Sequence, residues 1–145
     1  MVIDLHAEIA TRLAAVEQRY TANRRAIVDV LEAATRPLTI QEILERRSSL
    51  AQSSAYRNLG VLEETGVVHR VVSSDEFARY ELAEDLTDHH HHHLICRACG
   101  TVADFTVSSD IEATLAHALE RAAAAHDFAA EDHRLDLVGR CRRCA

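Results

Sequence analysis

Apolar side chains recur at helical spacing in four stretches within the first 65 residues of the chain. In the first stretch they lie three or four residues apart, which predicts an amphipathic helix over residues 5–19. These apolar positions are Leu5, Ile9, Leu13 and Val16. The same pattern predicts three further helices, which begin after Thr21, after Thr39 and at Gln52. The N-terminal part is therefore expected to be mainly helical.

Capping residues and helix breakers mark the ends of these helices. Pro37 ends the second helix, because the residue before a proline is pushed out of the helical region. Thr39 is followed three residues later by Glu42, which is the spacing of a capping box. Gly66 is suited to end the fourth helix, because glycine adopts the left-handed conformation of a helix C-terminus without strain.

The pattern changes from helical to extended after Gly66. Residues 67–72 and 77–82 are rich in β-branched and aromatic side chains and are separated by a short polar turn, which predicts a β-hairpin. Short helices followed by a hairpin form the outline of a winged helix-turn-helix, in which the helix before the wing enters the major groove of DNA. Residues 1–82 are therefore expected to form a winged-helix DNA-binding domain.

An acidic segment, residues 83–88, is expected to be a hinge before a second unit, residues 89–145. In this unit, extended stretches surround a helix that is predicted over residues 109–125. The extended stretches lie near residues 90–95, 102–107 and 135–138. The unit is poor in bulky apolar residues, so we expect it to need a metal and a partner chain for stability. The predicted fold class is α+β, with a winged helix-turn-helix domain followed by a small α/β dimerisation domain.

Composition narrows the cellular context and the kind of partner. The chain of 145 residues carries a net charge of −7, and all 16 of its basic residues are arginine. An acidic chain argues against nonspecific coating of nucleic acid, but a local arginine patch can still bind DNA. The sequence contains no apolar run long enough to span a membrane, and its N-terminus lacks the pattern of an export signal. We therefore expect a soluble, cytoplasmic protein without a membrane partner.

Histidine and cysteine are concentrated at the start of the second unit. Five histidines at residues 89–93 run into the Cys-x-x-Cys pair Cys96 and Cys99, and a second such pair, Cys141 and Cys144, follows near the C-terminus. An expression tag would explain a histidine run at a terminus, but this run is internal. In a chain without an export signal, two such pairs favour one tetrahedral zinc site over the alternatives, two disulfides or a redox pair. A site closed by four thiolates has a structural role.

The histidines are expected to serve two separate metal sites. If this stretch is extended, alternate side chains point to opposite faces of the strand. His91 and His93 then share one face, and His90 and His92 share the other. His89, the first of the five, is left without an assigned role.

The order of these motifs resembles the ferric uptake regulator family over nearly the whole chain. A winged-helix outline is followed by His-x-His-x-x-Cys-x-x-Cys and then by a closing Cys-x-x-Cys. Within this family, the histidine run and the sequence Cys-Arg-Ala-Cys-Gly look most like the zinc uptake regulators. The resemblance implies a homodimeric, metal-responsive transcription regulator, usually a repressor that binds operator DNA when it is loaded with regulatory metal.

The resemblance also implies which residues meet DNA. Tyr56 and Arg57 fall where the family has its recognition-helix signature. A tyrosine can contact a thymine methyl group or a phosphate, and an arginine can reach a guanine edge. Arg19, Thr21 and Arg24 match a second family motif, in which the first arginine approaches the minor groove and the helix start meets phosphate. Alternatively, Tyr56 packs in the core and Arg57 is a solvated charge.

One regulatory site is implied at the junction of the two domains, where the family adds ligands from the DNA-binding half to one face of the histidine strand. The expected ligands are His69, Glu81, His91 and His93. Asp85 is an alternative to Glu81, and His69 is alternatively an exposed wing residue. Pro37 stands where iron-type members carry a histidine, and it cannot ligate. Asp104, a ligand in peroxide-sensing relatives, is expected here to lie at the surface or to support the ligands from outside.

A second regulatory site is implied on the opposite face of the same strand. The expected ligands are His90, His92, Glu112 and His133, with a solvated charge as the alternative for Glu112. Iron-type members often carry an aspartate where His92 stands, and three imidazoles with one carboxylate shift the preference toward zinc. The expected cofactors are therefore structural Zn²⁺ and regulatory Zn²⁺, with Fe²⁺ or Mn²⁺ as alternatives for the regulatory metal.

These patterns predict a transcription regulator and not an enzyme, since the sequence contains neither His-Glu-x-x-His nor a deaminase-like zinc motif. The expected function is a repressor that binds operator DNA as a zinc-loaded homodimer and controls genes of metal uptake and homeostasis. Regulation by iron, manganese or peroxide is the alternative within the family. Metal storage or trafficking without DNA binding is a more remote alternative.

Overall fold

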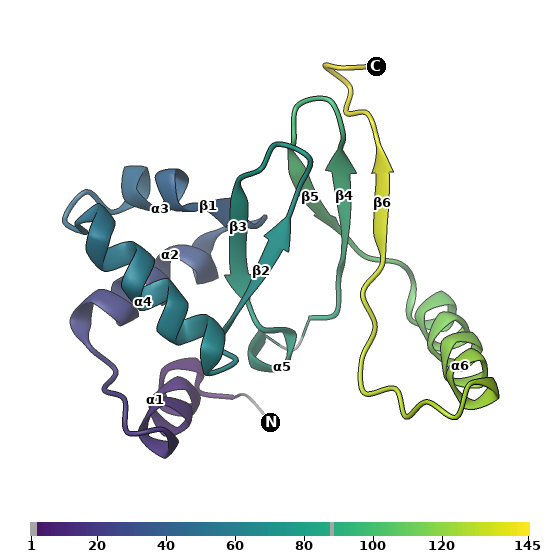
Figure 1. Ribbon diagram of the computed structural model, residues 1–145, viewed down its shortest axis with the longest axis horizontal. Helices are drawn as coiled ribbons and strands as arrows, with labels where there is room; N and C mark the ends of the chain where they lie inside the picture. The colour runs from purple at the N-terminus through teal and green to yellow at the C-terminus, as the bar shows by residue number, and fades with distance from the viewer. Residues whose placement is uncertain (1–2, 88) are drawn as a thin grey trace.

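The computed structural model describes residues 3–87 and 89–145, in which a helical N-terminal half is joined to a C-terminal half built on a small sheet (Figure 1). The helices of the N-terminal half are α1 (Leu5–Ala15), α2 (Ala22–Ala33), α3 (Ile40–Arg46) and α4 (Gln52–Glu64). They share one hydrophobic core, whose largest fully buried side chains include Ile9, Leu13, Ile27, Ile43 and Leu59. None of the helices in the described residues combines the length and the apolar character needed to cross a membrane.

Capping residues set the starts of α2 and α3 as the sequence predicts. The Thr21 hydroxyl accepts a hydrogen bond from a backbone N–H in the first turn of α2. Thr39 and Glu42 form both hydrogen bonds of a capping box at the start of α3. In contrast, α1 ends at Ala15, short of its predicted end, because Glu17 adopts a φ of 59° that a continuing right-handed helix excludes.

A β-hairpin follows α4, as the extended pattern predicts. Its strands, β2 (Val68–Val72) and β3 (Ala78–Leu82), pair in antiparallel fashion. A two-residue strand that the pattern did not reveal, β1 (Leu38–Thr39), pairs with the other side of β3, so that the strand order is β1-β3-β2. Because Leu38 is fully buried, β1 both extends the sheet and contributes to the core.

The expected hinge, residues 83–88, contains a short helix, α5 (Glu84–Thr87), while Asp88 lies outside the described residues. Ala83 and Leu86 are buried in the core of the N-terminal half. The described part of this segment is therefore packed onto the N-terminal half.

The C-terminal half contains a second three-stranded sheet with the strand order β5-β4-β6. Its elements are β4 (His92–Cys96), β5 (Val102–Phe105), α6 (Ser109–Ala125) and β6 (Asp136–Gly139). β4 runs antiparallel to β5 and parallel to β6. No residue of α6 is buried, and Figure 1 shows this helix on the far side of the sheet from the N-terminal helices. The predicted α+β fold is confirmed.

The turn of the hairpin docks on the loop between β4 and β5. Ser73 Oγ donates a hydrogen bond to the Gly100 carbonyl (2.8 Å), and Ser74 Oγ donates one to the Cys96 carbonyl (3.0 Å). Three apolar residues from the two halves pack together beside this contact: Val71, Ile95 and Val102. Gly100 has a φ of 77°, and a Cβ at this position would overlap the Asp75 side chain. The tip of the hairpin therefore fixes the two halves against each other.

Candidate metal centres and DNA-binding face

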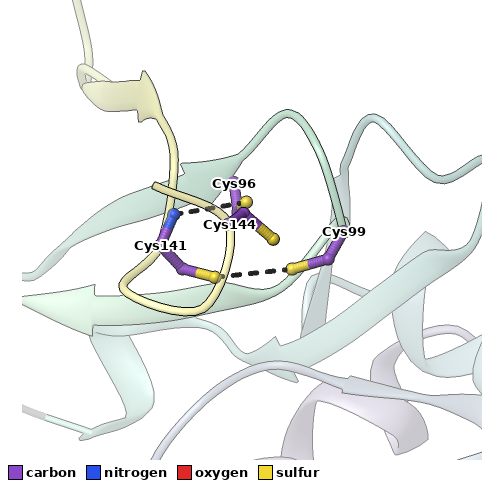
Figure 2. A group of neighbouring side chains, drawn as sticks. All are labelled: Cys96, Cys99, Cys141 and Cys144. Carbon is purple, nitrogen blue, oxygen red and sulfur yellow. Dashed lines mark hydrogen bonds between the residues drawn. The ribbon is translucent and has the colours of Figure 1, made fainter.

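Four cysteine sulfurs converge at one end of the C-terminal sheet (Figure 2). Cys96 ends β4, Cys99 lies in the turn that follows, and Cys141 and Cys144 lie just after β6. Because β4 and β6 are parallel neighbours, with Cys96 paired to Gly139, the strand ends bring the two Cys-x-x-Cys pairs together. The four sulfurs all lie within 4.8 Å of one another, and each cysteine is free of a disulfide.

The spacing of these sulfurs fits a tetrahedral zinc ion. Cys99 Sγ lies 3.7 Å from Cys141 Sγ, and Zn–S bonds of about 2.3 Å would place two sulfurs roughly 3.8 Å apart. The backbone N–H of Cys141 donates to Cys96 Sγ at 3.3 Å and lowers the pKa of that thiol to about 6. A hydrogen bond with Cys141 raises the pKa of Cys144 to about 12. Four thiolates repel one another, so all four can ionise together only around a cation such as zinc.

One histidine pair belongs to a group at the boundary of the two halves, which we call the junction cluster: Glu81, His91, His93 and Asp104. Glu81, on β3, accepts hydrogen bonds from His91 Nε2 (2.9 Å) and His93 Nε2 (2.8 Å). The two Asp104 oxygens each lie 3.7 Å from one of these nitrogens. Asp104 Oδ1 is buried and has no hydrogen-bond partner among the described residues. A buried carboxylate oxygen needs such a partner or a cation, so these residues fit a divalent metal.

Hydrogen bonding shifts the protonation of the junction cluster strongly. The hydrogen bond to Glu81 raises the pKa of His91 to about 9, although burial opposes this shift. Burial raises the pKa of Glu81, but the hydrogen bonds from His91 and His93 outweigh it and lower that pKa to about 2. Burial and the neighbouring charge of Glu81 raise the pKa of Asp104. At neutral pH His91 must therefore lose a proton before its Nε2 can bind a metal.

In the structure, Asp104 and not His69 lies together with Glu81, His91 and His93 in the junction cluster. Asp104 pairs with His93 across the β4–β5 hairpin, and directly opposed residues lie on one face with their Cβ atoms about 5 Å apart. His69 is exposed and lies outside the group, although it pairs with Glu81 across the wing. Asp85 also lies outside the group, and its carboxylate forms an ion pair with an arginine of α1.

The other histidine pair belongs to a group in the C-terminal half, which we call the α6 cluster: His90, His92, Glu112 and His133. The Glu112 carboxylate, in the first turn of α6, lies 2.8 Å from His92 Nε2, 2.9 Å from His90 Nε2 and 3.0 Å from His133 Nε2. Three imidazole nitrogens and a carboxylate oxygen are a ligand set that suits zinc. His89 is exposed and belongs to neither cluster.

The residues expected to meet DNA differ in their surroundings. Tyr56 is 57% exposed on α4, so it is not a core aromatic residue, and the neighbouring Arg57 is exposed as well. Arg19 is exposed just before α2. Arg24 is instead partly buried, and its guanidinium donates to a side-chain amide oxygen of α4 (2.9 Å) and to the Arg19 carbonyl (2.7 Å). Arg24 therefore clamps α2 to α4, and Thr21 caps α2.

The sequence and fold of this chain are similar to those of known proteins. A family model described as the ferric uptake regulator family matches residues 15–138. The chain belongs to the ferric uptake regulator family. The ferric uptake regulation protein of Bacillus subtilis is 30% identical over 141 residues, which cover 94% of this chain and 91% of that protein.

Two further ferric uptake regulator relatives illustrate the range of the family. The peroxide-responsive repressor of Staphylococcus aureus is 28% identical over 146 residues, with 94% of this chain and 91% of that protein covered. A solved structure of a zinc-bound manganese uptake regulator is 31% identical and superposes with a TM-score of 0.63, covering 96% of this chain and 99% of its own. Their names refer to peroxide and to manganese uptake, so family membership leaves the regulatory signal of this chain open.

Membership of the ferric uptake regulator family establishes the class of function. The chain is a metal-responsive transcription regulator, as its motifs predict. The metal that regulates it depends on the ligands that its own clusters provide.

Proposed function

We propose that this regulator is a zinc-responsive repressor that binds operator DNA as a homodimer and controls genes of metal uptake. The junction cluster is the observation that carries the control of DNA binding by a metal. Its Glu81 belongs to the wing hairpin of the N-terminal half, whereas its other three ligands lie in or beside the C-terminal sheet. A divalent cation held there would supply the positive charge that neutralises the two carboxylates and cross-links the two halves.

Glu81 connects the junction cluster with the helix that meets DNA. β3 is paired with β2 along its whole length, and β2 follows α4 after a short turn closed by Gly66. A metal that can bind all four ligands in only one arrangement of the two halves shifts the population toward that arrangement. Glu81, His91, His93 and Asp104 would thereby fix the orientation of α4, and in a dimer the two copies of α4 could reach successive major grooves.

Exposure supports three residues as the DNA contacts. Tyr56 and Arg57 project from α4, and Arg19 lies beside the start of α2. Thr21 and Arg24 contribute indirectly, because their hydrogen bonds shape α2 and hold it against α4. Contacts of the arginines with phosphate should make binding strongly dependent on salt.

Uncovered apolar surface in the C-terminal half supports the homodimer. Leu119, Phe128, Leu137 and Val138 are between 39% and 68% exposed. β6 lies at the edge of its sheet and leaves backbone groups available for a further strand. A second copy that covered α6 and β6 would remove this apolar surface from water, which is favourable in proportion to its area.

The ligand sets bear differently on the identity of the metal. The α6 cluster, with three imidazoles and one carboxylate, supports zinc. The junction cluster has two imidazoles and two carboxylates, and these harder ligands also suit Fe²⁺ or Mn²⁺. Regulation by iron or manganese is therefore the second candidate function, and peroxide sensing is a further variant within the family.

A metal titration tests these candidates. The protein, stripped of regulatory metal but with the cysteine-bound zinc retained, is titrated with Zn²⁺, Fe²⁺ or Mn²⁺ against labelled candidate operator DNA under anaerobic conditions. Zinc is expected to induce binding, read by fluorescence anisotropy, at the lowest free metal concentration. A lower threshold for Fe²⁺ or Mn²⁺ would replace zinc as the effector, and DNA binding that ignores all three metals would contradict metal control.

Metal binding at the junction cluster is expected to weaken in acid. Because the pKa of His91 is raised to about 9, this side chain is protonated at neutral pH and releases its proton when it becomes a ligand. Zinc affinity should therefore rise about tenfold per pH unit between about pH 7 and pH 9, and level off above that range. Chelator competition across this pH range measures the slope. A zinc affinity that stays constant from neutral to alkaline pH would rule out His91 as a protonated ligand.

A further inference from the structure

A carboxylate outside both histidine clusters contacts a member of each. Glu84 lies on α5, in the segment between the two halves. Its Oε2 accepts a hydrogen bond from His90 Nδ1 at 2.7 Å, and its Oε1 accepts one from the His91 backbone N–H at 3.2 Å. The Glu84 side chain is only 28% exposed. Glu84 therefore binds the two neighbouring residues, His90 and His91, that belong to different clusters.

The contact with Glu84 determines which nitrogen His90 presents to the α6 cluster. A neutral imidazole carries one N–H, so donation from Nδ1 leaves the lone pair on Nε2. His90 Nε2 lies 2.9 Å from Glu112 Oε1 and 3.1 Å from His133 Nε2, inside the α6 cluster. A carboxylate that accepts from the outer nitrogen of a ligating histidine orients the ring and makes the inner nitrogen a stronger ligand.

The helix that carries Glu84 is anchored in the N-terminal half. Leu86 is buried in the N-terminal core, and the Ala83 backbone N–H donates to the Val67 carbonyl at 2.9 Å. A shift of His90 would therefore be transmitted through Glu84 to α5, and α5 is packed on the core that supports the wing.

We propose that Glu84 is a positioning residue that presents His90 to the metal of the α6 cluster and couples the occupancy of that cluster to the N-terminal half. The proposal rests on the α6 cluster being a metal site, as the proposed function has it. Glu84 could instead act as a ligand, because Glu84, His90 and Asp132 also form a group of potential metal ligands. The two roles predict different results when Glu84 is changed.

Glu84→Gln separates these roles, because it keeps the shape of the side chain. Glu84 accepts two hydrogen bonds on two oxygens, whereas glutamine offers one oxygen and an NH₂ donor. In the variant, the glutamine NH₂ group must therefore face another donor, either the Nδ1–H of His90 or the backbone N–H of His91. Asp85→Asn is the matched control, because it removes the same charge one residue along α5 and its side chain pairs with Arg12 instead of a cluster.

The zinc affinity of the α6 cluster is measured by chelator competition in full-length protein that carries His91→Ala, which disables the junction cluster. In this background, Glu84→Gln is expected to weaken zinc binding roughly 10- to 100-fold, and Asp85→Asn to leave it within about twofold, because Asp85 is largely exposed. Equal affinity with and without Glu84→Gln, or equal losses in both variants, would overturn the proposal. The proposal would also be overturned if Glu84→Gln lost one further bound zinc in addition to the zinc of the α6 cluster. Glu84 would then be a metal ligand and not a positioning residue.

Two spectroscopic readouts complete the test. Nitrogen NMR of the histidines should show the Nδ1–H form of His90 in the background protein and its loss in Glu84→Gln. Hydrogen exchange at α5 should slow when zinc is added to the background protein, and should respond less in Glu84→Gln. Exchange at α5 that ignores zinc in the background protein would overturn the coupling. Because no DNA is present, a failure of the proposed repressor function would appear only in the operator titration.

Discussion

Replacing Cys96 with serine is expected to release the structural zinc and to unfold the C-terminal half of the protein. This half has little else to hold it together, since its buried apolar cluster consists of Ile95 and Val102 with one residue of the hairpin, and no residue of α6 is buried. Structural zinc supplies about 10 to 16 kcal/mol of apparent binding free energy, which is similar to the whole stability of an ordinary domain, about 5 to 15 kcal/mol. A neutral serine hydroxyl does not replace a thiolate as a zinc ligand.

Zinc analysis, thermal unfolding and sedimentation measure this effect. Cys96→Ser should lack tightly bound zinc and lose the cooperative unfolding of its C-terminal half, and with it the dimer. Ala98→Ser is the matched control, because it places the same hydroxyl at an exposed position of the same turn and leaves all four cysteines in place. If Cys96→Ser were as folded, dimeric and zinc-loaded as Ala98→Ser, the assignment of a structural four-cysteine site would be refuted.

Features that depend on one continuous segment could be predicted from the sequence. The range of α6, Ser109–Ala125, coincides with the predicted helix, because its apolar stripe lies within that segment and its N-cap, Ser108, immediately precedes it. The division of the histidines between two clusters also agrees with the predicted alternation, although β4 contains only His92 and His93, and His90 and His91 precede it. In contrast, β1 is only two residues long, too short to show alternation, and it exists because it pairs with β3 about 40 residues later.

The fourth member of the junction cluster, Asp104, could not be predicted from one continuous segment of the sequence. It depends on which strand lies beside β4, and the family resemblance directed the expectation toward the wing and His69. The register of the β4–β5 hairpin places Asp104 opposite His93. Counting outward from the turn at Gly100 would have shown this pairing, since both strands are close to that turn in the chain. The contact between Glu84 and His90 could not be predicted from the sequence in this way, because it depends on how α5 packs on the N-terminal half.

His91→Ala is expected to abolish metal-induced operator binding while the dimer and the cysteine-bound zinc persist. His91 Nε2 lies 2.9 Å from Glu81 Oε2 and 3.7 Å from Asp104 Oδ2, so its removal takes one of four ligands from the junction cluster and leaves the four cysteines untouched. Removing a ligand from a metal site should lower metal affinity by more than the roughly 10- to 100-fold loss typical of an outer-shell partner. Anisotropy titrations at fixed free zinc should show the loss as operator affinity no higher than that of the metal-free protein.

His69→Ala decides whether His69 or Asp104 serves as a ligand at the junction cluster. Both His69 and His91 lie near Glu81, but His69 is exposed and outside the junction cluster, so its replacement should leave metal-induced binding close to that of the unaltered protein. Asp104→Asn should resemble His91→Ala, because it removes the carboxylate charge opposite His93. If His69→Ala abolished the response and Asp104→Asn did not, the wing histidine would be the ligand. In that case the β4–β5 register would only place Asp104 near the site.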